Sequence, residues 1–433
     1  MIYQMGNSPA HAYMYDLALR EPGILVLHDV VLHHLRLWMA VNKGRARRRE
    51  YADDLARLYG TAGAELARAV LRGQTPATLF DYPLVEPVID AARAVIVHNE
   101  ASAERVRGLR PAARVCVVPM GVPLPQLPPR DEARERLGVT PEAFVVVSHG
   151  HVNPYKRLDV ALRSFRRLLD ERPDALFLIA GSVAPQLGTS LDRQIRYLGL
   201  GERVRRLGFV APGTVDDLLA AADCCVNLRY PSAGETSASL LRIMGAGLPV
   251  LVSDAASFRE LPDGCCAKIP VGPIEEALLA EYLIALARDE PLRASIGAAA
   301  REFVAERHSM ERSAEGYLAT LGEVLGRPLA LPEGGMQPAA RATVEGGVRP
   351  SAATATLRRL IRVPGSAIRM LRNPSRSSDV SVSEQGESPL AGEVATALAE
   401  LKLAGHEGLE RSVARDLVAL GLGAGEKRVT SNE

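Results

Sequence analysis

Short apolar runs alternate with segments of helix length through much of this sequence, most regularly between residues 136 and 327. Such alternation is typical of strands joined by helices, which form a parallel sheet covered by helices on both faces. The runs are bounded by polar residues and are shorter than an ordinary buried helix. We therefore predict an α/β fold built on buried parallel strands. The clearest runs are residues 144–150, 175–181, 224–230 and 249–254.

The chain has 433 residues, which is long enough for two or three domains. The first 123 residues repeat the alternation less regularly, so we expect a Rossmann-type domain there as well. Beyond residue 328 the sequence becomes rich in Pro, Gly, Ala and Ser, a composition that favours disorder. The predicted divisions are a partial first domain at 1–123, a linker at 124–135, a second Rossmann-type domain at 136–327, a disordered linker at 328–390 and a small helical tail at 391–433.

Composition excludes several classes of protein. The 52 basic and 51 acidic side chains leave a net charge of +1, which argues against a protein that coats nucleic acid. The five cysteines have no CxxC spacing and lie in apolar runs, a pattern typical of a reducing compartment. The sequence does not open with the segments of a secretion signal, and no window holds about 18 consecutive apolar residues. We therefore expect a cytoplasmic protein.

Ligands of open parallel sheets bind at the carboxyl ends of the strands, so the residues that follow each run are the first candidates. Gly150 ends one run and allows a tight turn. Asn153 can cap a helix that begins at Pro154, whose free N–H groups would then lie beside Lys156. This combination suits a bound phosphate. An ordinary capped helix with a solvated lysine is the alternative.

A loop of short polar residues follows the run 224–230. Its N–H groups and hydroxyls suit a polyhydroxyl ligand, and Glu235 adds a carboxylate that can bind sugar hydroxyls or stabilise developing positive charge. A capping motif with an incidental acid is the alternative interpretation. The loop residues singled out are Ser232, Gly234, Glu235, Thr236 and Ser237.

One histidine has the same strand-end position in the first domain. His28 follows the run 24–27, where it can face a cleft and handle a substrate hydroxyl. The paired acids at 53–54 and 216–217 lack the spacing of metal ligands and are expected on solvated helix faces. Neither a GxGxxG nor a GxxxxGK[ST] motif occurs, which weighs against a nicotinamide enzyme and a P-loop ATPase.

Taken together, these segments resemble the family 4 glycosyltransferases, which have the GT-B fold of two Rossmann-type domains. GHVNPYKR is similar to the family's phosphate segment, which implies that Lys156 binds phosphate and that His151 replaces the family's arginine. PSAGETSASLLRIMGAGLPVLVSD is similar to the donor-sugar segment and implies Glu235 as the first of its two glutamates. VLHD is similar to the strand end whose histidine, here His28, lies near the transferred sugar. VVPMGVP, IVHNEASAERV and RLGFV extend the resemblance over residues 1–325.

The sequence departs from the family in two places. The second glutamate, which holds the nucleotide ribose in the family, falls on Ile243 by spacing, and Arg242 occupies the nearest equivalent place. Glu260 is our candidate for the missing carboxylate. The glycine-rich strand, turn and helix that open the family's first domain are also not seen, so we expect an incomplete first sheet with an exposed edge, which a partner protein would cover.

The resemblance implies transfer of a sugar from a nucleotide-sugar donor to a hydroxyl acceptor, a glycan or a lipid-linked molecule, with retention of configuration. It implies no cofactor and no metal, because Lys156 and helix dipoles would stabilise the diphosphate. The alternative is a catalytically weak relative that binds a nucleotide sugar or a partner protein. An arginine-rich stretch around Pro364 fits either a solvated linker or peripheral contact with the inner face of a membrane. The implied catalytic residues are His28 and Glu235, and the implied donor-binding residues are Gly150, His151, Asn153, Lys156, Ser232, Gly234, Thr236, Ser237, Arg242 and Glu260.

Overall fold

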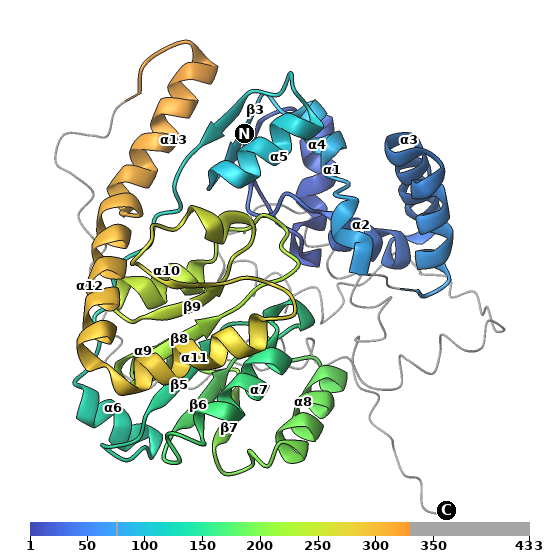
Figure 1. Cartoon of the computed structure of the whole chain (residues 1–433). Coiled ribbons are helices and arrows are strands. Elements are labelled where there is room, and N and C mark those ends of the chain that lie inside the picture. Colours follow the sequence, from blue (N-terminus) through green and yellow to red (C-terminus); the bar gives the residue numbers. More distant parts are fainter. Residues whose placement is uncertain (75–76, 330–433) are drawn as a thin grey trace, which may run out of the picture. The chain divides into compact units, whose positions relative to one another are not determined.

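The computed structural model describes residues 1–74 and 77–329, which form two sheets of parallel strands (Figure 1). The α/β prediction is confirmed, since every pairing between neighbouring strands is parallel. The first sheet has the order β1 (Ile2–Met5), β2 (Ile24–Leu27), β3 (Ala94–Val97), β4 (Val115–Val117). The second has the order β10 (Ala267–Ile269), β9 (Val250–Ser253), β8 (Cys224–Asn227), β5 (Val145–His149), β6 (Leu176–Ala180), β7 (Val204–Gly208).

Alternating side chains of the second sheet build two separate cores. On β5, Val146 packs into one core, while Val145 and Val147 pack into the other, as the two-residue period of a strand requires. The first core is closed by α7 (Leu158–Leu168), α8 (Pro185–Tyr197) and α11 (Glu275–Arg288). The second is closed by α9 (Pro212–Ala221), α10 (Ala238–Gly245) and α12 (Glu290–Arg307). Helices on both faces explain why these strands are continuous apolar runs.

The first sheet is covered by helices from both ends of the described chain. Leu25 and Leu27 face the helices of the first domain, whereas Ile24 and Val26 face Tyr317 and its neighbours on α13 (Met310–Leu325). The last described helix therefore packs on the first sheet (Figure 1). The helices of the first domain are α1 (Ala12–Arg20), α2 (His33–Asn42), α3 (Gly44–Leu71), α4 (Glu86–Ala91) and α5 (Glu100–Leu109).

A buried arginine joins α2 to α3. Arg36 is 3% exposed, and its guanidinium donates to Asp54 at 2.7 Å, to Glu50 at 3.2 Å and to the hydroxyl of Tyr15. The expectation of a solvated helix face is therefore wrong for Asp54, because a buried guanidinium needs a carboxylate partner. The prediction is confirmed for its neighbour Asp53, which is exposed.

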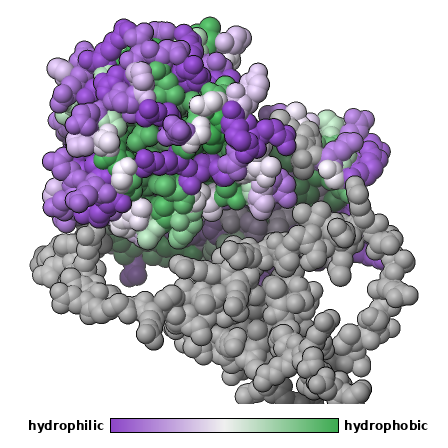
Figure 2. Space-filling view, turned by 90° about the horizontal axis from the view of Figure 1, so that it is seen from below, coloured by the Kyte–Doolittle hydropathy of each residue, from purple (hydrophilic) through white to green (hydrophobic). Residues whose placement is uncertain are grey.

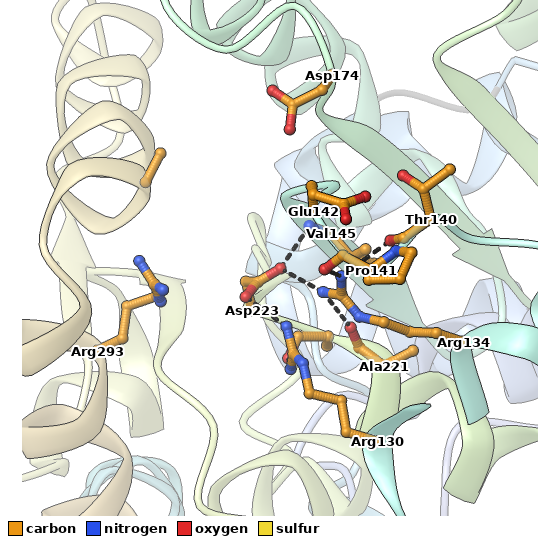
Figure 3. A network of polar contacts seen from close by, with 12 residues as sticks. Arg130, Arg134, Thr140, Pro141, Glu142, Val145, Asp174, Ala221, Asp223 and Arg293 are labelled. Carbon is orange, nitrogen blue, oxygen red and sulfur yellow. Dashed lines mark hydrogen bonds and ion pairs between the residues drawn. The ribbon is translucent and has the colours of Figure 1, made fainter. Parts of the chain in front are cut away.

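The segment expected to link the two domains contains a helix, α6 (Arg130–Leu137). Figure 3 shows how Arg134 connects α6 to the second sheet. The Arg134 guanidinium donates to Asp223 at 2.9 Å and to the carbonyl oxygens of Thr140, Pro141 and Ala221. Asp223 in turn accepts the backbone N–H of Val145 at 2.7 Å. This network ties α6 to the beginnings of β5 and β8.

Hydrophilic residues cover much of the described face in Figure 2, with hydrophobic residues scattered among them. Within residues 1–74 and 77–329, no helix is both long and apolar enough to cross a membrane. The predictions for 328–390 and 391–433, including the arginine-rich stretch around Pro364, fall almost entirely outside the described residues.

Candidate active site

A buried ammonium group lies at the carboxyl end of β5. The chain turns at Gly150, whose φ of +119° favours glycine, and then forms the short 3-10 helix η3 (Pro154–Lys156). Lys156 is only 7% exposed, yet no ion pair joins it to any residue in the described ranges. A Cβ atom added to Gly150 would lie 3.4 Å from Lys156 Nζ and 3.6 Å from Ser239 Oγ. The turn, the ammonium and the first turn of α10 therefore meet at one place.

Burial lowers the pKa of this lysine. Burial and the nearby positive charge of Arg229 lower the pKa of Lys156 to about 7, while the carboxylate of Glu235 acts in the opposite direction. His149, the last residue of β5, is neutral at neutral pH, since burial and the charge of Lys156 lower its pKa to about 4. An anion that entered this site would compensate the charge of Lys156.

The carboxylate of Glu235 lies beside this lysine and is held from two sides. Arg229, which follows β8, forms an ion pair with Glu235 Oε1, and the Ser232 hydroxyl donates to Oε2 at 2.8 Å. The side chains of Arg229 and Glu235 are each 12% exposed. The structure thus brings three of the sequence candidates, Lys156, Ser232 and Glu235, close to one another.

His28 lies at the carboxyl end of β2 in the first sheet. Its Nε2 is 2.7 Å from Gln4 Oε1, and its ring centroid is 5.1 Å from that of His98. Burial lowers the pKa of His28 to about 4, and His98 adds to the effect, so the imidazole is neutral at neutral pH. Burial raises the pKa of the adjacent Asp29 to about 6, with a further contribution from the charge of Glu235.

The loop that carries Glu235 is hydrogen-bonded to the first domain. The Val30 N–H donates to the carbonyl of Ala233 at 2.7 Å. The side-chain amide of Asn99 donates to the carbonyl of Gly234 at 3.0 Å and to the hydroxyl of Thr236 at 2.9 Å. Polar groups of Gly234 and Thr236 are therefore engaged by the protein itself. The same contacts bring the strand ends of the two sheets together.

Three other sequence candidates have partners of their own. Arg242 forms an ion pair with Asp216 at 2.6 Å. Glu260 accepts the N–H groups of Glu100 at 3.0 Å and Ala101 at 2.6 Å, so it caps the start of α5. Ser237 caps α10 by accepting the Leu240 N–H at 3.3 Å.

The remaining two candidates lie on the turn after β5. Asn153 precedes η3 but makes no capping hydrogen bond, and the α-helix itself begins at Leu158, later than the motif suggested. The His151 ring lies 2.8 Å from the Ser182 hydroxyl, beyond the end of β6. His151 is exposed, so its ring is open to a ligand at this edge of the sheet.

A cavity of about 280 Å³ lies beside this turn and is lined by Gly181, Arg206 and Gly208, among others. Gly181 has a φ of +154°, and a Cβ atom there would stand 1.9 Å from the carbonyl oxygen of Gly150. We expect Gly181→Ala to displace the turn and to lower the free energy of unfolding by more than about 2 kcal/mol. Urea denaturation of the variant tests this. Gly201→Ala is the control, because a Cβ there meets nothing within 4 Å, and equal losses in both would contradict the prediction.

Sequence reasoning did not single out Arg229, Asp29 and His98, although all three lie within two residues of a strand end. His98 is 6% exposed, and its Nδ1 bonds the carbonyl of Val118 at 2.9 Å. The strand-end rule that selected His28 would have selected these residues too. Their importance depends on contacts between segments far apart in the sequence, which no local pattern encodes.

The chain is similar to known proteins in sequence and in fold. Residues 129–303 match the family described as "Glycosyl transferases group 1". A D-inositol 3-phosphate glycosyltransferase of Mycobacterium sp. (strain JLS) is 29% identical over 253 residues, covering 57% of this chain and 54% of the relative. One from Kribbella flavida is 28% identical over 314 residues, covering 68% of this chain and 70% of the relative. The match thus spans about half the length of the Mycobacterium relative.

Solved structures support the fold. Sucrose-phosphate synthase from Thermosynechococcus elongatus superimposes with a TM-score of 0.55 at 17% identity, covering 75% of this chain and 74% of that one. HepE from Anabaena, whose structure holds UDP and glucose, gives 0.52 at 19% identity, covering 74% and 98%. The protein therefore has the GT-B fold. Residues 129–303, which match the group 1 glycosyltransferase family, carry Lys156 and Glu235.

Proposed function

We propose that this protein transfers a sugar from a nucleotide-sugar donor to a hydroxyl acceptor with retention of configuration. The observation that carries the proposal is Lys156, a buried ammonium without an ion pair among the described residues, at the strand ends of a group 1 glycosyltransferase domain. A buried charge without a partner is costly, so its retention favours an anionic ligand. The diphosphate of the donor has the required charge, and the cavity beside Gly181 has room for part of its nucleoside.

Each gathered residue has a chemical part in the proposed reaction. Lys156 neutralises the leaving diphosphate, which in turn helps to take the proton of the acceptor hydroxyl. Glu235 binds sugar hydroxyls and stabilises the positive charge of an oxocarbenium-like transition state. His28 orients the sugar or the acceptor, and its neutral imidazole serves this role better than a charged ring. In this proposal the charge of Lys156 replaces that of a metal ion.

The proposed acceptor side is the first domain, where His28, Asp29 and His98 follow the ends of β2 and β3. The two relatives described above are named for inositol 3-phosphate, which makes it the first acceptor to assay. Glycans and lipid-linked hydroxyl compounds are the next. The decisive assay follows release of nucleoside diphosphate from nucleotide sugars with and without each acceptor. Donor binding without transfer or hydrolysis would favour the alternative of a catalytically weak relative.

Glu235→Ala is expected to reduce turnover by about 100-fold or more, while the affinity for nucleoside diphosphate alone does not fall. The reason is that Glu235 contacts the sugar in this proposal and not the diphosphate. Steady-state kinetics and calorimetric titration of the same protein measure the two effects. An equal loss in turnover and in diphosphate affinity would assign Glu235 to the nucleotide instead.

A further inference from the structure

Arg229 is held next to the lysine of the proposed site. Its backbone N–H donates to Ser253 Oγ at 2.9 Å, and the next residue, Tyr230, donates its N–H to the carbonyl of Tyr155 at 2.8 Å. The guanidinium carbon lies 5.7 Å from the centroid of the Tyr155 ring. These contacts join the end of β8 to η3, and the positive charge of Arg229 is close enough to Lys156 to lower its pKa.

Only part of the positive charge in this space is paired. Arg229 forms an ion pair with Glu235, whereas Lys156 forms none in the described part of the chain. Burial raises the pKa of Asp29 and the charge of Arg229 acts to lower it, but no ion pair joins that carboxylate to either cation among the described residues. The Nε of Arg229 is buried without a hydrogen-bond partner there, so the guanidinium has donor capacity to spare. The site therefore has an unpaired positive charge on Lys156 and an unused N–H donor on Arg229, and a bound anion would satisfy both.

We propose that Arg229 is a second diphosphate-binding residue and that Glu235 occupies its guanidinium only while the donor site is empty. A diphosphate that enters the site binds Arg229 in place of Glu235. The carboxylate of Glu235 is then free to bind the sugar hydroxyls. This partner exchange rests on the proposed function, since it concerns the same site. It names Arg229 as a binding residue and gives Glu235 a different partner in each state.

The chemistry of the groups favours such an exchange. A planar guanidinium matches a phosphate group with two parallel hydrogen bonds, as it does a carboxylate, so the two anions compete for the same donors. Ser232 holds the second oxygen of Glu235 and keeps the carboxylate in the site after Arg229 leaves it. A diphosphate without a sugar leaves the released carboxylate without hydroxyl partners, whereas a nucleotide sugar supplies them. Glu235 should therefore weaken the binding of the free diphosphate and strengthen the binding of the nucleotide sugar.

The test compares two ligands on four proteins. The nucleoside diphosphate that stabilises the wild type, chosen from UDP, GDP, ADP and TDP, and its nucleotide sugar are titrated by calorimetry. The variants are Glu235→Gln, Arg229→Gln and the control Glu276→Gln, whose carboxylate pairs with Arg163 and with neither Arg229 nor Lys156. We expect Glu235→Gln to bind the diphosphate about three- to tenfold more tightly and the nucleotide sugar no more tightly. Arg229→Gln should lose about 10- to 100-fold in diphosphate affinity, and the control should not change.

The outcomes separate this inference from the proposed function. A wild type that binds a diphosphate, with Glu235→Gln binding it no more tightly, would overturn the exchange alone. Unchanged diphosphate affinity in Arg229→Gln would also overturn the exchange alone. A wild type that binds no diphosphate would overturn the proposed function and the exchange with it. If Arg229→Gln does not fold, the double variant R229Q/E235Q replaces it, because it leaves neither charge unpaired.

Discussion

Lys156→Met is expected to make the empty protein more stable by about 1–3 kcal/mol at pH 7. Methionine keeps the length of the side chain and removes a charge that is 7% exposed and has no ion pair in the described ranges. Because burial lowers the pKa of Lys156 to about 7, the unfolded chain binds the extra proton between pH 7 and about 10. The destabilising effect of the lysine is therefore complete below pH 7 and fades as the pH rises towards 10.

Urea denaturation at pH 6.5 and at a pH near 10 measures this difference. The gain of Lys156→Met should be large at the lower pH and should shrink at the higher one. Lys268→Met is the control, because the Lys268 ammonium already has a carboxylate, Asp263, at 3.0 Å. A Lys156→Met protein less stable than the wild type at pH 6.5 would contradict our account of an unpaired buried charge.

The same substitution should weaken the binding of nucleoside diphosphate by about 1.5–3 kcal/mol. In the wild type, a bound diphosphate raises the pKa of Lys156, so affinity should fall by up to about tenfold per pH unit above pH 7. A nucleotide sugar is the suitable ligand for this measurement, since its diphosphate has no proton to lose in that range. Lys156→Met should show a flat profile, and a flat wild-type profile would contradict the assignment.

Arg134→Ala is the second change with a large expected effect, a loss of about 3–5 kcal/mol in the free energy of unfolding. Arg134 is 2% exposed, and its removal leaves the carbonyls of Thr140, Pro141 and Ala221 without their donor (Figure 3). The matched control is Arg130→Ala. Arg130 pairs with the same carboxylate, Asp223, but its side chain is 43% exposed.

Arg130→Ala should therefore cost less than about 1 kcal/mol, as is usual for exposed ion pairs. Urea denaturation of both variants gives the comparison directly. Similar losses would mean that burial does not set the strength of this network. A large loss in Arg130→Ala alone would mean that Asp223 depends on the exposed partner.

Buried strands are the easiest to predict from the sequence. Ala94–Val97 and Ile24–Leu27 are apolar throughout because helices cover both faces of their sheet. The strands that sequence patterns did not reveal, Val204–Gly208 and Ala267–Ile269, lie at the two edges of the second sheet. An edge strand tolerates charged residues such as Arg205 and Lys268, so it has no continuous apolar run.

The candidate site was also only partly predictable from the sequence. Lys156 and Glu235 could be found by reading the residues after each strand, because parallel sheets bind ligands there. The lowered pKa of Lys156 could not be predicted, since it depends on burial and on the nearby charge of Arg229. The contact between Glu260 and the first turn of α5 could not be predicted either, because Glu260 and Ala101 are 159 positions apart in the sequence. Such pairings are decided by tertiary packing alone.

The most direct test of the central claim, that Lys156 and its neighbours bind the diphosphate of a nucleotide sugar, is a thermal-shift panel. Wild type and Lys156→Met are heated with UDP, GDP, ADP and TDP, and with NAD as a control. A ligand present at about 100 times its dissociation constant should stabilise the protein by roughly 2.7 kcal/mol. We expect one diphosphate to raise the melting temperature of the wild type and not that of Lys156→Met. No shift with any diphosphate, in a wild type that melts cooperatively, would contradict it.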